Sequence, residues 1–263
     1  MNIPFHKAHG AKNDFLLTDT REVPDGLDLP KVARAICDRN TGVGADGWML
    51  IDERPGIRLF NSDGSEPELS GNGTRCAAAL LIQRGARENP IVIQTGAGPK
   101  ELRLISRDGN RFEFEMNMGK PRVIDVHFTI SVAGRDFDAT LIDVGNPQCA
   151  IAVDDFAWDW ISAGAAIETD AHFPNRTNVS FLRVTDSNTI DVRFYERGAG
   201  VTQSSGTGST GAACCALTRG LVSRPVKVLT PAGPLVVEER GDYYLQGPAQ
   251  IVASGIYNYD EWR

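Results

Sequence analysis

Short runs of alternating or β-branched residues recur along the chain, and two longer apolar stretches separate them. Runs such as IRLF, IVIQ, RFEFEM, FTISVAG, DVRFYE and VKVLT have the composition and spacing of strands. Residues 72–84 and 207–218 are instead Ala-rich and of helical length, and each is followed by a glycine, Gly85 and Gly220. Apolar residues cover most of the circumference of both stretches, which predicts two buried central helices.

The same two stretches belong to an internal repeat. The segment SGNGTRCAAALLIQRG at 70–85 aligns with SGTGSTGAACCALTRG at 205–220, an offset of 135, with seven identities in sixteen positions. TGAGP at 95–99 and TPAGP at 230–234 match at the same offset. Single residues outside these segments also match: Arg58 with Arg193, Gly10 with Gly145 and Asp19 with Asp154. Separate matches at one offset, with no gap between them, indicate that one half is a copy of the other.

The repeat and the mixture of strands and helices predict an α+β or α/β protein of two pseudo-symmetric domains. Each domain is expected to fold a curved mixed sheet around its central helix, with the active site in the interdomain cleft. The Gly119-Lys120-Pro121 sequence is typical of a boundary. We therefore expect an N-terminal domain over 1–117 and a C-terminal domain over 118–263, with the option that the last residues return to the first domain.

The charge pattern bears on the partners of the chain. The formal net charge is −7 and the pI is about 5.2, and the basic residues form no run, which argues against a nucleic-acid surface. No stretch approaches the roughly 20 apolar residues of a membrane-spanning helix. The N-terminal residues also lack the layout of an export signal. These features predict a cytoplasmic protein with no nucleic-acid and no membrane partner.

The cysteines are odd in number and include no CxxC pair. They are Cys37, Cys76, Cys149, Cys214 and Cys215. In a cytoplasmic chain of this size we interpret them as small buried hydrophobic residues, with disulfides and zinc ligation as minor alternatives.

Both predicted helices begin with small residues, Ser-Gly-Asn-Gly at 70–73 and Ser-Gly-Thr-Gly at 205–208. A helix start presents unpaired N–H groups and the positive end of the helix dipole, and glycine lets a ligand approach the backbone. If the pseudo-symmetry brings the two starts together, they form one carboxylate site with Ser70 and Ser205 on opposite sides. An alternative of equal weight is that both serines are only N-caps, because serine is a preferred N-cap residue.

A second glycine pattern is present without its usual context. Gly206, Gly208 and Gly211 satisfy GxGxxG, but the preceding strand ends about nine residues earlier, and the first copy has Cys76 in place of the third glycine. GxSxG is absent. The histidines are scattered and form no recognisable triad or metal cluster: His6, His9, His127 and His172. We therefore predict neither a nucleotide site nor a metal site.

Several longer motifs resemble one known family. FNSDGSEPELSGNGTRC at 60–76 and YERGAGVTQSSGTGSTGAA at 195–213 resemble the two signatures of the diaminopimelate epimerases. The resemblance extends over nearly the whole chain, through HGAKNDF near its start, TGVGADG, GNPQ, FPNRTNV, TPAGPLVVE and LQGPA. So many motifs in one order identify the chain as a member of this family.

The resemblance implies an isomerase that converts LL- to meso-2,6-diaminopimelate, a precursor of lysine and peptidoglycan, without pyridoxal phosphate or any other cofactor. It also implies a two-domain fold and, in many relatives, a homodimer. One thiolate removes the α-proton while a thiol on the opposite face delivers another. Position by position, the catalytic residues correspond to Ser70 and Ser205, with Glu196 and Gln148 beside them. The substrate-binding residues correspond to Asn13, Asn61, Gly71, Asn72, Asn146, Asn178, Glu196, Arg197, Gly206 and Thr207.

The binding residues divide by the part of the substrate that they suit. Backbone N–H groups at Gly71, Asn72, Gly206 and Thr207 suit the reacting carboxylate. Glu196 and Arg197 suit the distal ammonium and carboxylate of a diamino diacid. The asparagines have an alternative role in turns, where asparagine is common.

The sequence departs from the family at the chemistry itself. Serine stands at both base positions, and Gln148 stands where the family usually has a histidine beside one thiol. A thiol has a pKa of about 8.5 and is readily poised as thiolate, whereas a serine hydroxyl needs an adjacent base. Cys214 and Cys215 cannot substitute, because at 1.5 Å per residue they lie roughly 14 Å along the helix from its start.

Several interpretations of the serines stay open. They are the replacement that would be made to trap an intact substrate complex, or they belong to a natural variant, which Gln148 favours slightly because a trapping mutant has no need of it. A natural serine form could epimerise weakly, or act as another isomerase or a dehydratase of the same superfamily. A non-catalytic amino-acid-binding protein is a third interpretation, from a different functional class.

Overall fold

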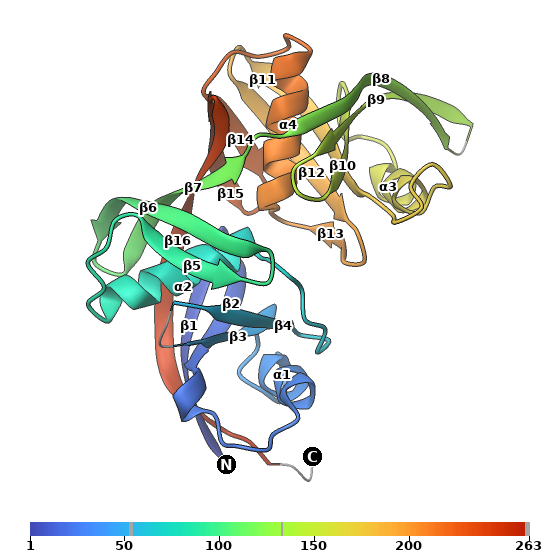
Figure 1. Cartoon of the computed structure of the whole chain (residues 1–263). Helices are drawn as coiled ribbons and strands as arrows, with labels where there is room; N and C mark the ends of the chain where they lie inside the picture. The colour runs from blue at the N-terminus through green and yellow to red at the C-terminus, as the bar shows by residue number, and fades with distance from the viewer. Residues whose placement is uncertain (53–54, 133, 261–263) are drawn as a thin grey trace. The chain divides into compact units, whose positions relative to one another are not determined.

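The computed structural model describes residues 1–52, 55–132 and 134–260. Their contacts divide the chain into two compact units, Met1–Met116 with Gly247–Arg263, and Asn117–Gln246. The last strand, β16 (Asp242–Asn258), begins in the second unit and continues in the first. The chain therefore ends in the unit where it started, and the amino group of Met1 donates to the carbonyl of Tyr259 (Figure 1).

The first unit is a mixed sheet with helices. Its strands are bonded in the order β4-β3-β2-β1-β16, in which β2 and β3 are parallel and the other neighbours antiparallel. A further set, β5-β6-β7, joins where β7 pairs with β16. The elements are β1 (Asn2–Gly10), β2 (Asn13–Asp19), the 3-10 turn η1 (Thr20–Glu22), α1 (Leu29–Cys37), β3 (Gly47–Ile51), β4 (Ile57–Asn61), α2 (Gly71–Gln83), β5 (Ile91–Thr95), β6 (Gly98–Asp108) and β7 (Arg111–Gly119).

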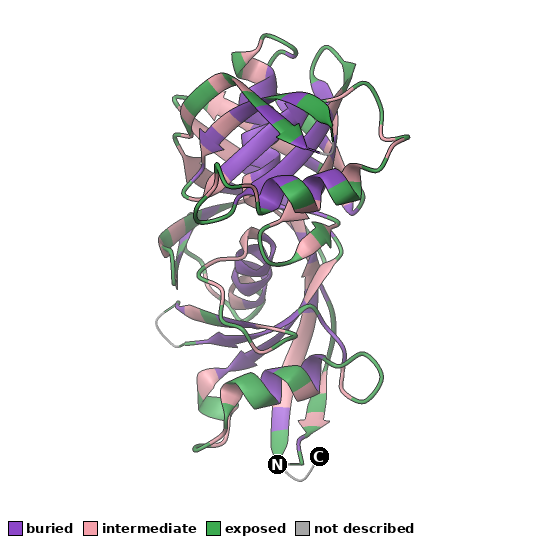
Figure 2. Cartoon of the chain, turned by 90° about the vertical axis from the view of Figure 1, so that its right-hand side faces the viewer, coloured by how far each residue is buried: buried purple, intermediate pink, exposed green. Residues whose placement is uncertain are grey.

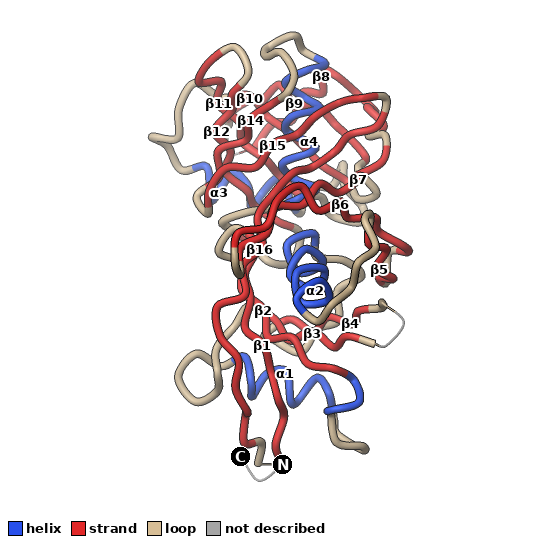
Figure 3. Tube along the Cα trace, turned by 90° about the vertical axis from the view of Figure 1, so that its left-hand side faces the viewer, coloured by secondary structure: helices blue, strands red, loops and turns tan. Residues whose placement is uncertain are grey.

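The burial pattern explains why these segments take their places. β3 (GWMLI) is buried along its whole length, as expected for a strand covered on both faces. β5 (IVIQT) buries Ile91 and Ile93 and exposes the residues between and beside them, the alternation of a strand with one face on a core. Helix α2 is buried from Asn72 to Leu80 and contacts β1, β2, β4 and β5. Strands surround this helix in Figure 3.

The second unit repeats the plan with a larger sheet. The strand order is β8-β9-β10-β11-β12-β14-β15, continued by the first residues of β16, and β10–β11 and β12–β14 are parallel pairs. The elements are β8 (Arg122–Val132), β9 (Arg135–Asp143), β10 (Pro147–Ala152), α3 (Trp160–Glu168), β11 (Asn178–Asp186), β12 (Thr189–Glu196), β13 (Gly200–Thr202), α4 (Gly206–Thr218), β14 (Val226–Thr230) and β15 (Gly233–Arg240).

Two kinds of core hold the second unit together. Helix α4 is buried from Gly208 to Ala216 and contacts strands β9 to β12, β14 and β15; it is drawn buried in Figure 2. On the side of α3, aromatic rings pack together: Trp158 stacks on Phe137 with centroids 5.5 Å apart and meets Phe181 edge to face with centroids 5.3 Å apart. Such aromatic pairs stabilise a core beyond the area that they bury.

The predicted repeat is visible in the elements themselves. Helices α2 and α4 begin and end at the offset of 135, as do strands β5 and β14. The residue before each helix is a serine with almost the same backbone, φ −130° and ψ 115° at Ser70 and φ −135° and ψ 126° at Ser205. The helices start one residue earlier than predicted because the serines, and not the following glycines, are the N-caps.

Most sequence-based expectations about the fold are confirmed. The predicted fold class, a curved mixed sheet around a central helix in each half, is the one observed. Five of the six quoted runs lie wholly in strands; of FTISVAG, residues 128–132 lie in β8, Ala133 lies outside the described residues and Gly134 is in the turn that follows. The five cysteines are buried free thiols, as interpreted, and burial raises the pKa of Cys37 and Cys76 to about 12. Across the described ranges, no helix has both the length and the apolar character needed to cross a membrane.

The glycine that follows α4 allows a test of the role of backbone conformation at the helix end. Gly220 follows α4 with φ 67°, its N–H donates to the carbonyl of Leu217 at 3.0 Å, and a Cβ at this position would meet no atom within 4 Å. A side chain added at residue 220 should therefore change stability only through the left-handed backbone conformation that this position adopts. Gly220→Ala should lower the free energy of unfolding by about 1–2 kcal/mol, and Gly220→Asn by less, in urea unfolding followed by circular dichroism. Equal stability of the alanine variant and the parent would contradict this account.

Candidate active site

The start of α2 in the first unit has two backbone donors left over. The Ser70 hydroxyl oxygen accepts from the N–H of Gly73 at 3.1 Å, and the Ser70 carbonyl accepts from Thr74 at 2.8 Å. The N–H groups of Gly71 and Asn72 meet no acceptor in the described part of the chain. A cavity of about 270 Å³ borders Ser70 on the side of residues 57–59, 66–69 and 96. The site therefore offers two free donors beside a capping serine.

Side-chain amides continue from this helix start. The Asn72 amide NH2 donates to Asn13 Oδ1 at 3.2 Å, and the Asn13 amide NH2 donates to Asp46 Oδ2 at 2.7 Å. Asp46 is also paired with Arg39 at 2.9 Å. Two of the residues assigned by resemblance, Asn13 and Asn72, are thus brought together by the structure.

Asn61 makes a separate set of contacts. It ends β4, its amide NH2 donates to Ser65 Oγ at 2.9 Å, and its backbone N–H donates to the Ser65 carbonyl at 2.8 Å. These are contacts of a turn, the alternative that the sequence left open for the asparagines. No hydrogen bond joins Asn61 to Ser70 among the described residues.

The start of α4 in the second unit repeats the capped geometry and adds a carboxylate. Ser205 Oγ accepts from the N–H of Gly208 at 3.1 Å, and the N–H groups of Gly206 and Thr207 have no acceptor in the described ranges. The Ser205 hydroxyl also donates to Glu196 Oε1 at 2.6 Å. Ser205 is therefore both an N-cap and the partner of a carboxylate.

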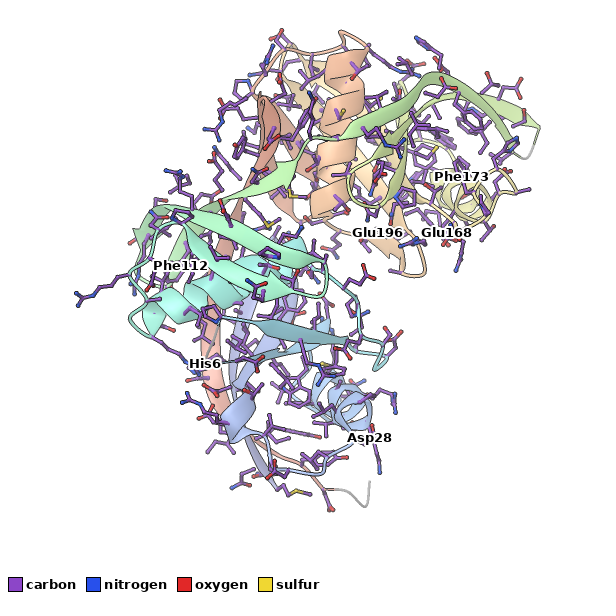
Figure 4. The ribbon with its side chains drawn as sticks, viewed as in Figure 1. His6, Asp28, Phe112, Glu168, Phe173 and Glu196 are labelled. Atoms are coloured by element: carbon purple, nitrogen blue, oxygen red, sulfur yellow. The ribbon has the colours of Figure 1, made fainter. Side chains whose placement is uncertain are left out.

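Glu196 is an acid whose pKa is shifted. Burial raises the pKa of its carboxyl, and the hydrogen bond from Ser205 partly offsets that rise. Glu196 ends β12, and Figure 4 shows it on the same side of the unit as Glu168. The offset of 135 places Asn61 at the corresponding position of the first copy. The two copies therefore carry a carboxyl group and an amide at equivalent strand ends.

Gln148, at the position of the usual family histidine, lies inside the second unit. It is 2% exposed, its amide NH2 donates to Asn146 Oδ1 at 2.7 Å, and the Asn146 NH2 donates to Thr207 Oγ1 at 3.3 Å. Gln148 Oε1 has no partner among the described residues. A Cβ at Gly211 would lie 3.2 Å from the Gln148 side chain, so the absence of a side chain there gives the glutamine its room.

Asn178 and Arg197 lie together at the corner after β12. Asn178 Oδ1 accepts from the backbone N–H of Arg197 at 3.1 Å, and its NH2 donates to the Pro147 carbonyl at 2.9 Å. The Arg197 side chain is exposed and donates to the Asn175 carbonyl at 3.2 Å. Asn178 thus shapes the corner that places Glu196 and Arg197.

Two charged residues of these surroundings were missed by the sequence analysis. Glu168 accepts from the N–H of Gly198 at 3.0 Å and from Arg176 at 2.5 Å, and so it supports the corner after β12. Arg75 is fully buried beside Asn72. The available signal for Arg75 was a charged residue near the start of a helix that is otherwise mostly small and apolar; the motif did not indicate its contacts.

Comparisons with known proteins agree with these motifs. A family model described as diaminopimelate epimerase matches residues 5–124 and 140–252. A diaminopimelate epimerase of Pelotomaculum thermopropionicum is 38% identical, over 97% of this chain and 99% of that protein. One from Synechocystis is 36% identical, again over 97% and 99%.

Solved structures show the same fold at low identity. A phenazine biosynthesis protein of the PhzF family from Bacillus anthracis aligns with a TM-score of 0.73 at 14% identity, over 98% of this chain and 100% of that one. A hydroxyproline epimerase from Agrobacterium vitis also reaches 0.73 at 14% identity, over 99% and 94%.

The raised pKa of Glu196 generates a prediction about pH. Because the carboxyl group keeps its proton to a higher pH in the folded state than in the unfolded state, stability should fall as the pH rises from the ordinary value of 4.5 through the raised value. Glu196→Gln should therefore be more stable than the parent at pH 8, and the difference should disappear below the ordinary value of 4.5, where both states are protonated. Urea unfolding across this pH range measures the trend.

Glu66 supplies the matched control. Its pairing with Arg58 lowers the pKa of its carboxyl, so Glu66→Gln should cost stability at pH 8, and that cost should fade in acid. A Glu196→Gln variant that is less stable than the parent at pH 8 would overturn the assignment of an unfavourable buried carboxylate.

Proposed function

The chain belongs to the diaminopimelate epimerase family, and on that premise we propose that it binds 2,6-diaminopimelate and exchanges the proton at one of its α-carbons. The observation that carries the proposal is the pair of capped helix starts, each with two N–H groups beside residue 70 or 205 that have no partner among the described residues. Such donors match a carboxylate, and they match it better as the α-carbon loses its proton and charge moves onto the oxygens.

The proposed reaction transfers one proton on each face of the α-carbon. A base takes the proton from one face, the electron pair of the broken C–H bond passes toward the carboxylate, and an acid delivers a proton to the other face. Inversion therefore requires both helix starts to act on one substrate molecule, with residues 70 and 205 as the two groups. No pyridoxal phosphate takes part in this scheme.

The two serines are unequal in this chemistry. When Ser205 takes the α-proton, its own proton has an acceptor 2.6 Å away at Glu196 Oε1. Ser70 has no carboxylate hydrogen-bonded to it in the described ranges, so losing its proton leaves an unsupported alkoxide. The parent chain is therefore expected to be a poor two-base catalyst whose residual activity comes from the Ser205 side.

The bond between Ser205 and Glu196 favours a second candidate function. With a supported base on one face only, a one-sided proton transfer suits the chain, such as isomerisation or dehydration of an amino acid without inversion. Exchange of the α-proton with retention of configuration would distinguish it from epimerisation. Binding without turnover is the third candidate, and it predicts affinity for diaminopimelate with no exchange at all.

The rest of the substrate is assigned to the corner after β12. Arg197 is exposed there and held by Asn178 through its backbone, so its guanidinium is available to a distal carboxylate. Glu196 was assigned by resemblance to the distal ammonium as well, but its bond to Ser205 favours the role beside the base. Asn13, Asn72, Asn146 and Asn178 complete the proposed polar lining, together with the N–H groups at positions 71, 72, 206 and 207.

Location and assembly are also proposals. We infer a cytoplasmic protein from the five free thiols, which suit a reducing compartment. We infer a homodimer from the family resemblance. Sedimentation at micromolar concentration tests the assembly, and a monomer at all concentrations would contradict it.

Restoring both thiols should raise the reaction sharply. The caps and free donors are in place, so Ser70→Cys with Ser205→Cys should increase exchange of the diaminopimelate α-proton with D2O by about 100-fold or more, the usual range for a positioned acid or base. Each single change should do much less, because groups that act as a unit are non-additive. Adding Gln148→His should increase the rate further.

Deuterium incorporation by mass spectrometry measures this rate, and chiral chromatography separates inversion from retention. Cys215 provides a control, since Cys215→Ser alters a buried thiol away from the helix start and should leave the rate unchanged. A serine parent that already matches the double-cysteine variant would show that the two-thiol scheme is wrong for this chain.

Arg197 should set the affinity for the distal end. Loss of a charge-assisted hydrogen bond costs about 1.5–3 kcal/mol, so Arg197→Ala should weaken diaminopimelate binding roughly 10- to 100-fold in calorimetry on the serine form. Arg122→Ala removes an equally exposed arginine, paired with Asp143, and should leave the affinity unchanged. Equal affinities for the Arg197 variant and the parent would remove the distal role.

A further inference from the structure

Arg75 is a buried cation without an ionic partner. It is 0% exposed near the start of α2, and no carboxylate in the described ranges lies within ion-pair distance of it. Burial lowers its pKa to about 10, which leaves the guanidinium charged at neutral pH. A buried charge that is not neutralised by an ion pair is costly, so its contacts need an explanation.

Those contacts are few and specific. Arg75 Nε donates to the Pro248 carbonyl at 3.1 Å, and Nη2 donates to Asn72 Oδ1 in a short hydrogen bond. Nη1 has no acceptor among the described residues. The guanidinium thus joins the returning strand β16 to the side chain of a residue at the helix start.

The Asn72 contact decides how a whole chain of amides is oriented. A guanidinium can only donate, so Asn72 must turn its oxygen toward Arg75 and its NH2 toward Asn13. Asn13 must then present its oxygen to Asn72 and its NH2 to Asp46. A carboxylate can only accept, so Asp46 fixes the other end. Because this series of hydrogen bonds runs from a cation to an anion, the orientation of both amide groups is determined.

The orientation of the two amides decides which of their atoms are available to a ligand at the helix start. Both amide oxygens are occupied by donors, so the two side chains have only the second N–H of each amide left for a ligand, in addition to the free backbone N–H groups of Gly71 and Asn72. If the Asn72 amide turned over, its oxygen would take the place of its second N–H. An oxygen there would repel a carboxylate instead of binding it.

The second copy has no such anchor. The position that corresponds to Arg75 is Thr210, whose hydroxyl donates to the Gly206 carbonyl at 2.9 Å. The amides there run from Gln148 to Asn146 to Thr207, and Gln148 Oε1 is left without a partner in the described chain. Both ends are neutral, so charge does not fix the orientation of these amides.

We propose that Arg75 is a positioning residue, which holds the Asn72 amide so that the start of α2 presents only donors to the substrate carboxylate. The proposal deepens the proposed function and rests on the carboxylate binding at that helix start. Its basis is the directed series of hydrogen bonds Arg75 to Asn72 to Asn13 to Asp46 and the complete burial of the guanidinium.

A double-mutant cycle tests whether Arg75 acts through Asn72. Calorimetry of diaminopimelate binding to the serine form compares Arg75→Met, Asn72→Ala and the double variant. Arg75→Met alone should weaken binding at least about tenfold, and in the Asn72→Ala background it should have little further effect, because the two residues share one interaction. Arg75→Lys, which keeps one donor for Asn72 Oδ1, should recover most of the affinity. Equal losses in both backgrounds would overturn the proposal.

A matched control and a ligand-free readout keep this test separate from the proposed function. Arg219→Met removes another largely buried arginine, at the far end of α4, and should leave the affinity unchanged. In ligand-free 15N-labelled protein, the Asn72 side-chain amide should lose protection from exchange in Arg75→Met and keep it in Arg75→Lys. An Asn72 amide that is equally protected in all forms overturns the positioning role, even if diaminopimelate proves to be the wrong ligand.

Discussion

The constraint on which the site depends is the start of a buried helix. The first N–H groups of a helix have no partner within it, and in a protein interior each needs one. At α2 and α4 the preceding serine satisfies one donor through its side chain, at Gly73 or Gly208, and the next two donors are left over. Burying the middle of each helix while leaving these donors free requires a ligand or water with accepting oxygens.

Both copies of the repeat have such a helix start, but they differ in the charged residues beside it. At the strand end before the helix one copy has Asn61 and the other Glu196, and near the start of the helix one has Arg75 and the other Thr210. In the described ranges the first copy therefore buries a cation with no carboxylate at ion-pair distance, and the second has a half-buried acid that no cation pairs with. A reaction that moves a proton from one face of a carbon to the other gains from this difference, because one side must accept while the other donates.

The central helices could be predicted from the sequence, but these side-chain contacts could not. The central helices and their glycine stops followed from composition and the 135-residue offset, because burial and capping are local rules. The hydrogen bond between Ser205 and Glu196 could not be predicted so directly, since it depends on how β12 ends beside α4. Arg75 was overlooked for a similar reason: its partner Pro248 is distant in sequence and meets it only because β16 returns to the first unit.

The capped geometry also explains how serine can stand at these positions without disturbing the fold. A serine oxygen accepts the N–H of Gly73 or Gly208 at 3.1 Å, which a sulfur atom does only weakly, so the hydroxyl favours the helix start as a structure. The same bond draws on the lone pairs that a base would use. At Ser205 the carboxyl group of Glu196 accepts a hydrogen bond from the hydroxyl, which makes the serine oxygen more basic; at Ser70 no carboxylate does so among the described residues. At residue 70 the hydrogen bond that stabilises the helix cap therefore lowers the reactivity of the hydroxyl as a base. Among the described residues, only the second copy has a carboxyl group, that of Glu196, which offsets this loss.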